Sequence, residues 1–492
     1  DALDWISKQP WCDGNIGMQG SSYLGFTQMA CTMARHPALK CIIPEVCMGT
    51  VFSDALYIGG GFTQGAVSYI FEMLDKKILP NRTWSEILRH RPLIEIDSFA
   101  AGEDLPQWNT QMDHWRSDDY WKQQDFFLTT KPRNVAALQI GGWFDDCFPG
   151  MRRSWELLQR QGGGQPQRMI IGPWRHNYND NRKLNGFDFG ISSLRTDIFL
   201  IKQMWFDRFL KGMDNGVDQP VVEYFVLGAN EWRSAAAWPP KNAEPRKWYF
   251  HSSGRAHKLE TDGRLSPLPP SGSETADEYI YDPEDPAPNW MSWDRLEYFE
   301  DVQQFPYDFK DIETRNDVVI YTSAPLKEDL TVAGDVMAVL YTSCDVKDTD
   351  WWVYLSDVHP DGSSVRLTTY MLRARFRNLE DKVHHVFGSN FEKEELLSGD
   401  MTDVVRYDIS MLGTAAVFKK GHRLRIGVTN ACEGYGFPNS NTGKNEAYVT
   451  KTVKGTMAIH HSKKYPSHVI LPVLKKSEDN GDGALECWSV DR

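Results

Sequence analysis

The stretch Gly20-Ser21-Ser22-Tyr23-Leu24-Gly25 decides how the rest of this chain is interpreted. An apolar run at residues 16–18 predicts a buried strand before it, and a helix is expected over residues 23–36. A serine at a sharp strand-to-helix turn exposes its hydroxyl next to backbone N–H groups that can stabilise an oxyanion. Gly20 and Gly25 suit such a turn, whose neighbours must be small. The same six residues also fit an ordinary Gly/Ser-rich loop, so the motif alone leaves both interpretations open.

The composition excludes several classes of partner. The chain has 492 residues, enough for two or three domains, and a formal net charge of −13. That charge argues against nucleic acid and against an anionic membrane surface as partners. No apolar stretch is long enough to span a bilayer, and residues 1–5 lack the features of a signal peptide. The eight cysteines show no metal-type spacing, so we expect no metal, no cofactor and a reducing, cytoplasmic location.

The pattern of apolar residues predicts two kinds of architecture. Up to about residue 220, buried strands alternate with helices, which indicates a mostly parallel α/β sheet. A helical insertion over about residues 51–127 interrupts the alternation. After about residue 221 the chain is all-β, with short alternating strands, which indicates a β-sandwich of the jelly-roll type.

Two later loops complete a candidate catalytic set. Asp145 and His176 each follow a predicted buried strand, in the order Ser22, Asp145, His176 that serine hydrolases with this turn use. Asp145 or Asp146 could instead cap the following helix, and His176 could be an ordinary loop residue. Three loops at matching topological positions favour the catalytic interpretation. The remaining noteworthy histidines are expected to be structural or surface residues: His36, His384, His385, His460 and His461.

Several motifs together resemble the CocE/NonD acyl-esterase and X-Pro dipeptidyl-peptidase (S15) hydrolases. The resemblance covers essentially the whole chain, and these segments carry it: residues 11–18, 20–25, 142–145, 172–176, 228–233, 248–251 and 421–425. It implies an α/β-hydrolase domain in two parts (1–50 and 131–235), a helical cap (51–130) and a C-terminal jelly-roll domain (236–492). It also implies that Ser22 is the nucleophile, His176 the base and Asp145 its partner, with the Tyr23 backbone N–H as one oxyanion donor.

One departure from that family concerns the start of the chain. Only 21 residues precede Ser22, whereas several strands precede the nucleophile in α/β-hydrolases, so the front strands of the sheet are expected to be missing. In the family this segment supplies a tyrosine hydroxyl as second oxyanion donor, and no residue here matches it. We therefore expect a missing N-terminal segment or a companion chain as a partner, and homodimerisation is a further expectation.

A second departure concerns the substrate. Family members that hydrolyse α-amino acid esters carry acidic residues two and three places after the catalytic aspartate, where this chain has Cys147 and Phe148. An uncharged small-molecule acyl ester is therefore the predicted substrate, cleaved through an acyl-enzyme intermediate. The alternatives are an X-Pro dipeptidyl-peptidase or other amide hydrolase, and a catalytically incomplete binding or scaffold protein. Aromatic residues that either line an acyl pocket or pack in the core are Phe52, Tyr57, Phe62, Trp108, Trp115, Trp143 and Trp174.

Overall fold

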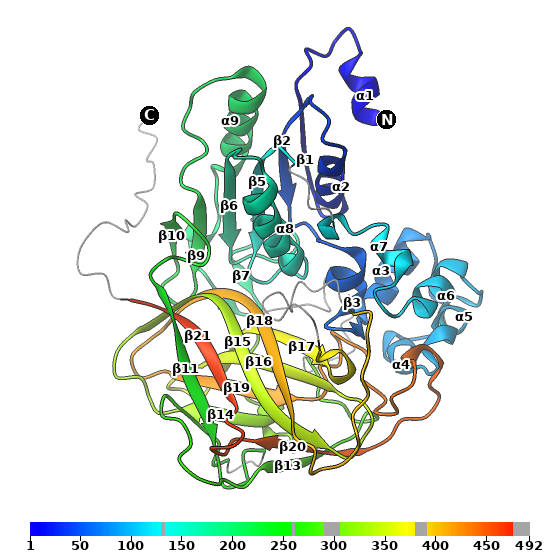
Figure 1. The fold of residues 1–492 in the computed structure, drawn as a ribbon, viewed down its shortest axis with the longest axis vertical. Coiled ribbons are helices and arrows are strands. Elements are labelled where there is room, and N and C mark those ends of the chain that lie inside the picture. The colour runs from blue at the N-terminus through cyan, green and yellow to red at the C-terminus, as the bar shows by residue number, and fades with distance from the viewer. Residues whose placement is uncertain (129–132, 258–260, 290–305, 379–390, 476–492) are drawn as a thin grey trace.

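A six-stranded sheet organises the N-terminal part of the chain (Figure 1). The computed structural model describes residues 1–128, 133–257, 261–289, 306–378 and 391–475. The first five strands of this sheet are parallel, and the sixth is antiparallel to the fifth, which confirms the predicted α/β sheet. The strands lie in the order β1 (Ile16–Ser21), β2 (Leu39–Glu45), β5 (Ala136–Gly142), β6 (Gln167–Gly172), β9 (Val222–Val226) and β10 (Glu231–Ala235).

Helices cover both faces of this sheet. α2 (Tyr23–Cys31) and α8 (Phe148–Gln161) share one hydrophobic cluster with the sheet. α9 (Ile198–Lys211) packs in a separate cluster on the opposite face. Strands covered on both faces are apolar almost throughout, and every residue of β5 is buried. The short helix α1 (Ala2–Ser7) precedes β1, which is one edge of the sheet.

The helix after Ser22 is shorter than the sequence predicts. It ends at Cys31, and a 3₁₀ turn (Thr32–Ala34) follows it. Arg35 then adopts a left-handed conformation with φ 47°, which ends the helical run. Pro37 contributes, because the residue before a proline is disfavoured in the helical region.

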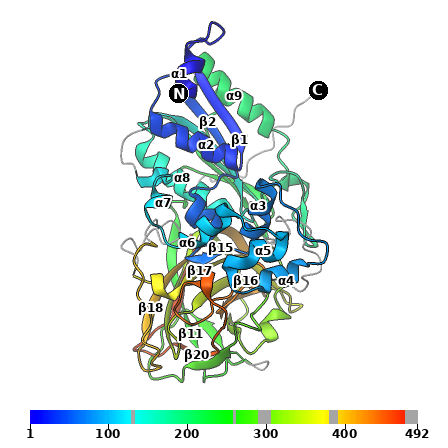
Figure 2. The ribbon, with the colours of Figure 1, turned by 90° about the vertical axis from the view of Figure 1, so that its right-hand side faces the viewer.

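A group of short helices lies between β2 and β5 in the sequence and beside the sheet in space (Figure 2). Their buried residues belong to a hydrophobic cluster that continues into the C-terminal domain, so the group packs against both parts of the molecule. The helices are α3 (Gly65–Met73), α4 (Trp84–Arg89), α5 (Ile96–Ala101), α6 (Pro106–Asp113) and α7 (Asp119–Lys122). We call these helices the cap.

The C-terminal part is β-rich, as predicted. Eleven of its described strands are joined by hydrogen bonds, with β15 pairing with β18, β20 and β21. The jelly-roll topology and the bounds of the four predicted segments stay predictions. The strands are β11 (Ala243–His251), β12 (Arg264–Ser266), β13 (Asp277–Tyr281), β14 (Val319–Ser323), β15 (Leu330–Cys344), β16 (Asp350–Val358), β17 (Ser364–Arg373), β18 (Val405–Phe418), β19 (Arg423–Thr429), β20 (Gly455–His460) and β21 (His468–Leu474). Two short hairpins lie outside both sheets: β3 (Tyr57–Ile58) with β4 (Gly61–Phe62), and β7 (Lys183–Leu184) with β8 (Phe187–Asp188).

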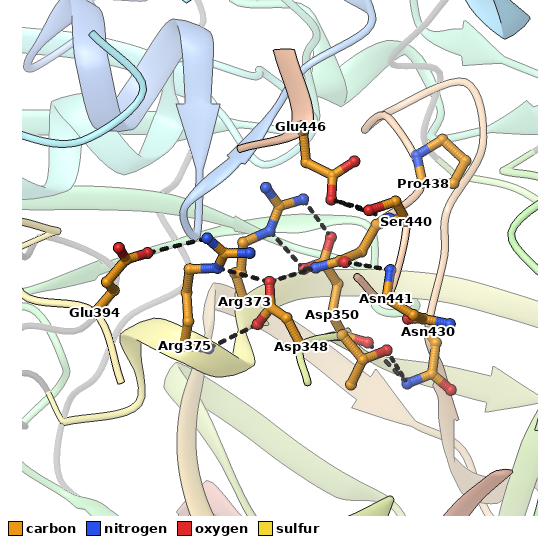
Figure 3. A network of polar contacts seen from close by, with 12 residues as sticks. Asp348, Asp350, Arg373, Arg375, Glu394, Asn430, Pro438, Ser440, Asn441 and Glu446 are labelled. Atoms are coloured by element: carbon orange, nitrogen blue, oxygen red, sulfur yellow. Dashed lines mark hydrogen bonds and ion pairs between the residues drawn. The ribbon is translucent and has the colours of Figure 1, made fainter. Parts of the chain in front are cut away.

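Buried ion pairs crowd the side of the β-rich domain that faces the cap (Figure 3). Arg373 binds Asp350 through two hydrogen bonds of 2.8 and 2.9 Å. Arg375 Nε lies 2.7 Å from an Asp348 oxygen. The cap residue Arg91 reaches the same region and donates to a Glu446 oxygen at 3.0 Å. Removing one partner of a pair this deeply buried would be costly, because the other charge would be left unpaired.

Two further sequence-based expectations concern particular positions. No helix among the residues that the structure describes has the length and hydropathy needed to cross a bilayer. His384 and His385 lie outside the described residues, whereas His461 is fully buried and bonded to two carboxylates. The expectation that His461 is structural therefore agrees with its surroundings.

Candidate active site

Ser22 lies at a strained turn between β1 and α2. Its backbone angles are φ 57° and ψ −124°, a left-handed conformation that non-glycine residues rarely adopt. A Cβ atom at Gly20 would lie 2.7 Å from Leu24 Cβ, and one at Gly25 would lie 2.8 Å from Cys47 Cβ. Both positions therefore require glycine, as the sequence predicts for such a turn. The Ser22 N–H donates to the Glu45 carbonyl at 2.9 Å, which ties the turn to the end of β2.

The three predicted loops meet at one point. Ser22 Oγ lies 2.9 Å from His176 Nε2, and His176 Nδ1 lies 2.9 Å from Asp145 Oδ1. Ser22 follows β1, Asp145 follows β5 and His176 follows β6, so all three side chains come from the carboxyl ends of parallel strands. This is the geometry in which a serine can pass its proton to an imidazole held by a carboxylate.

Backbone contacts hold the aspartate and histidine loops together. The Trp143 N–H donates to the Gly172 carbonyl at 2.9 Å, and the Phe144 N–H donates to the Trp174 carbonyl at 3.0 Å. The ladder between β5 and β6 therefore continues into the two loops. As a result, the separation of Asp145 from His176 is set by backbone hydrogen bonds rather than by flexible side chains.

Asp145 contacts both the backbone just before α8 and the imidazole of His176. Its Oδ1 atom accepts the Cys147 N–H at 3.1 Å, just before α8, and also faces His176. The carboxyl side chain is fully buried, and Oδ2 has no hydrogen-bond partner among the described residues. The contact with the Cys147 N–H fixes which oxygen points at the imidazole. The N-cap residue of α8 is Cys147, so Asp145 is not the helix cap.

Asp146 lies closer to the imidazole than the sequence indicated. Its Oδ1 atom is 3.5 Å from His176 Nδ1, so two neighbouring carboxylates face one ring nitrogen. From the sequence, Asp146 was expected only as an alternative helix cap. The adjacent pair Asp145-Asp146 was a visible signal, but which of the two contacts the ring depends on the loop conformation.

Two residues near Ser22 were not predicted. Glu45 ends β2, and its carboxylate accepts the Ser21 hydroxyl at 2.9 Å and lies 2.6 Å from Lys202 Nζ. A charged residue at the carboxyl end of a buried strand is the signal that could have singled out Glu45. Lys202 sits on the amphipathic helix α9, where the sequence offers no sign of this contact.

The same region contains a set of metal-binding atom types. Donor atoms of Asp145, Asp146, Cys147 and His176 lie within 4.8 Å of one another. Both ring nitrogens of His176 are, however, hydrogen-bonded to Ser22 and Asp145. Burial raises the pKa of the Cys147 thiol well above its usual value, and the nearby charges of Asp146 and Asp145 raise it further, which disfavours a thiolate ligand. These contacts fit a proton relay better than a metal centre.

Tyr23 is the first residue of α2, so its N–H has no acceptor within the helix. Its side chain is 49% exposed beside the turn. Tyr69 on the cap helix α3 lies within electrostatic reach of Tyr23 and Cys147, and burial raises the Tyr69 pKa. The cap therefore lies near the site at α3, which the amino-acid sequence did not indicate.

Six of the seven predicted pocket aromatics are buried, and Trp115 is partly buried. Tyr57 stacks on Phe52 with ring centroids 4.9 Å apart and packs at a tilt on Phe62 at 5.0 Å, and Phe62 packs on Trp108 at 5.6 Å. Tyr57, Phe62 and Trp115 line a small cavity whose lining includes no residue of the Ser22 site.

The two tryptophans that follow β5 and β6 each pack against another tryptophan. Trp143 lies 5.4 Å from Trp238 between ring centroids, and its indole N–H donates to the Phe225 carbonyl at 2.7 Å. Trp174 lies 5.6 Å from Trp232, and its N–H donates to the Ser193 carbonyl at 2.9 Å. Their contacts are those of core residues, and a pocket role for any of the seven aromatics stays a prediction.

Comparison with known proteins places the chain among serine hydrolases. Residues 1–178 match the family model described as X-Pro dipeptidyl-peptidase (S15 family), and residues 215–470 match the X-Pro dipeptidyl-peptidase C-terminal non-catalytic domain. Cocaine esterase from Rhodococcus sp. (strain MB1 Bresler) is 29% identical over 97% of this chain and 83% of the relative.

Two solved structures share the fold. An aminopeptidase from the marine sediment archaeon Thaumarchaeota archaeon superposes with a TM-score of 0.83 and 25% identity, over 96% of this chain and 79% of that one. An α-amino acid ester hydrolase superposes with a TM-score of 0.81 and 24% identity, with the same coverage of both chains. The activities in these names belong to the relatives.

Proposed function

Because the chain belongs to the X-Pro dipeptidyl-peptidase (S15) family, which here includes CocE/NonD hydrolases, we propose that it cleaves acyl esters through a serine acyl-enzyme intermediate. The observation that carries the proposal is the chain of contacts from Ser22 Oγ through His176 to Asp145, with 2.9 Å at each link. Ser22 is the proposed nucleophile, His176 the base and Asp145 the group that orients the base.

The proposed reaction has two halves. Ser22 Oγ attacks the ester carbonyl carbon while its proton moves to His176 Nε2, and the imidazolium gives this proton to the leaving alcohol as the C–O bond breaks. A water molecule then repeats the sequence on the acyl-enzyme: His176 takes a proton from the water, the acid is released, and Ser22 recovers its proton. Asp145 stabilises the imidazolium in both halves.

The negative charge that develops on the carbonyl oxygen needs donors. The Tyr23 N–H at the start of α2 is the proposed donor, since the helix terminus places both an N–H group and a positive dipole end beside Ser22. No second donor can be assigned within the described ranges. One missing donor typically costs about 3 kcal/mol of transition-state stabilisation. The presence or absence of a second donor therefore strongly affects the expected kcat.

The acyl group of the proposed substrate is uncharged. Cys147 and Phe148 occupy the positions where amine-binding acids would be expected, and Phe148 is fully buried with its ring 5.3 Å from that of Trp143. Neither side chain offers a charge to an ammonium group. An X-Pro dipeptide substrate remains the second candidate, because both matching family models are described by that activity.

Two measurements test these proposals. A fluorophosphonate probe should label the wild-type protein and fail to label Ser22→Ala, whereas labelling of neither would favour the non-catalytic scaffold alternative. A panel of short acyl esters and X-Pro amides should then give hydrolysis of the esters. Faster turnover of X-Pro amides than of esters would replace the esterase proposal with the peptidase one.

A further inference from the structure

A second group of titratable side chains lies at one end of the β-rich domain. Asp357 is near the end of β16, and His359 follows two residues later, so both point to the same side of the strand. His422 immediately precedes β19, which pairs with β16 in the register Val358 to Arg423. Continuing this antiparallel register by one residue sets His422 opposite His359. Sheet pairing therefore brings the three side chains together.

The donor atoms of the three residues converge. His422 Nδ1 lies 2.9 and 3.0 Å from the two Asp357 oxygens, and His359 Nε2 lies 3.5 Å from Asp357 Oδ2. One donor atom from each residue falls within 4.8 Å of the others. Neighbouring ligands in a tetrahedral zinc site are about 3.3 Å apart, given metal–ligand bonds of about 2.0–2.1 Å, so small side-chain adjustments suffice.

We propose that Asp357, His359 and His422 form a binding site for a divalent late first-row transition ion of the zinc class. Two imidazoles and one carboxylate suit Zn²⁺ and Co²⁺, whereas Mg²⁺ and Ca²⁺ prefer oxygen ligands alone. The Asp357 side chain is 11% exposed, that of His422 is 17% and that of His359 is 35%. Three protein ligands with a partly open side leave a coordination position for water.

The backbone around this site is held before any ion binds. The His359 N–H donates to the Ser363 carbonyl at 2.9 Å across the β16–β17 turn. On the other strand, the His422 carbonyl accepts the Leu326 N–H at 2.8 Å, and the His422 N–H donates to the Lys419 carbonyl at 3.0 Å. A preorganised ligand set is expected to bind a metal more tightly than the same residues on mobile loops.

Negative charge around the three ligands also favours a cation. Asp308 and Asp361 act electrostatically on His359, and His422 acts on Asp329. The lysines Lys310 and Lys419 partly offset these charges, since each lies within 4.0 Å of one of the acids. An ion here would join the turn after β16 to the turn before β19. Both turns belong to the β-rich domain, whereas Ser22 belongs to the α/β domain.

A metal titration tests the proposal. We expect the chelator-treated chain to bind Co²⁺ with the visible absorption of nitrogen- and oxygen-ligated cobalt, and Zn²⁺ to displace it. His422→Ala and His359→Ala should each weaken this binding by about 100-fold or more. His36→Ala is the matched control, because His36 also pairs with an aspartate, Asp4 at 3.2 Å, but belongs to no such group of ligand atoms in the part of the chain that the structure describes.

Thermal unfolding gives an independent readout. Zn²⁺ should raise the Tm of the wild type and of His36→Ala but leave the Tm of His422→Ala unchanged. Asp357→Asn, which keeps the side-chain shape, serves if a histidine variant fails to fold. Equal Co²⁺ affinity in His36→Ala, His422→Ala and Asp357→Asn would overturn the proposal, as would the absence of any cobalt spectrum in the wild type.

Discussion

Glu45 and Ser21 are joined by a hydrogen bond of 2.9 Å from the serine hydroxyl to a carboxylate oxygen. The other Glu45 oxygen lies 2.6 Å from Lys202 Nζ, which is also 3.4 Å from the Tyr178 hydroxyl. The Glu45 carbonyl accepts the Ser22 N–H. One residue at the end of β2 thus contacts both residues of the nucleophile turn and, through Lys202, the loop that follows β6.

We therefore expect Glu45→Gln to slow the chemical step without weakening substrate binding. Ser21 and Lys202 each donate to a different oxygen of the Glu45 carboxylate, whereas the glutamine amide has a single, uncharged oxygen. One of the two contacts is therefore lost, and the turn should shift slightly. Small displacements of a nucleophile can cost up to about 100-fold, and we expect roughly a 10-fold loss in kcat with little change in KM. The measurement is steady-state kinetics together with the rate of fluorophosphonate labelling. Glu244→Gln is the control, since Glu244 pairs with Lys475 at 2.6 Å in the other domain; equal labelling rates in the two variants would show that Glu45 does not position Ser22.

Asp145→Asn should reduce kcat less than the same substitution does in enzymes where it alters the imidazole tautomer. The Cys147 N–H donates to Asp145 Oδ1, the same oxygen that faces His176. This contact should keep the asparagine carbonyl oxygen toward the ring, with its NH₂ group at the unpartnered Oδ2 position. The loss is then that of a charge-assisted hydrogen bond, about 1–2 kcal/mol, or roughly 5- to 30-fold in kcat. A loss near 10⁴-fold, measured against Asp145→Ala, would mean that the amide is flipped and the tautomer changed.

The placement of the proposed catalytic residues could be predicted because it follows from chain topology. Carboxyl ends of parallel strands share one edge of a sheet, so loops after three buried strands were expected to meet there. The contacts of Glu45 and Asp146 could not be predicted in this way. They depend on strand register and on one loop conformation, neither of which is visible in apolar periodicity.

The aromatic residues show a second limit of the sequence. Trp143 and Trp174 follow strands that lead to the site, yet their rings pack against Trp238 and Trp232. A tryptophan in a pocket and one in a core have the same local sequence pattern, since only the surrounding fold decides which face is covered. The strand order of the β-rich domain was equally inaccessible, because pairs such as β12 with β14 join segments far apart in the chain.

Asp350→Ala should strongly destabilise the protein. The side chains of Asp350 and Arg373 are 2% and 4% exposed, and the aspartate oxygens accept two hydrogen bonds that the guanidinium donates (Figure 3). Removing it leaves a buried charge unpaired, which typically costs about 3–5 kcal/mol of unfolding free energy. The double variant Asp350→Leu, Arg373→Met should recover much of this loss. Chemical denaturation measures both.

A surface pair provides the comparison for the buried one. Asp214 is 93% exposed and pairs with Arg208, so Asp214→Ala should change stability by no more than about 1 kcal/mol. If Asp350→Ala lost as little unfolding free energy as Asp214→Ala, the buried charge pairs that face the cap would not contribute to stability in the way proposed.

His461 should make the stability of the β-rich domain depend on pH. Burial alone would lower its pKa, but hydrogen bonds and charges from Asp277 and Glu274 outweigh burial and raise the pKa above its usual value. A raised folded-state pKa means that the stabilisation is complete below the unfolded pKa of about 6.5 and is lost as pH rises through the folded value. We expect His461→Gln to lower Tm more at pH 5.5 than at pH 9, both measured by tryptophan fluorescence.

His468→Gln should show the opposite trend, because burial lowers the pKa of His468 and makes its protonation favour the unfolded state. The same pH trend in both variants would contradict a protonated His461 held between two carboxylates.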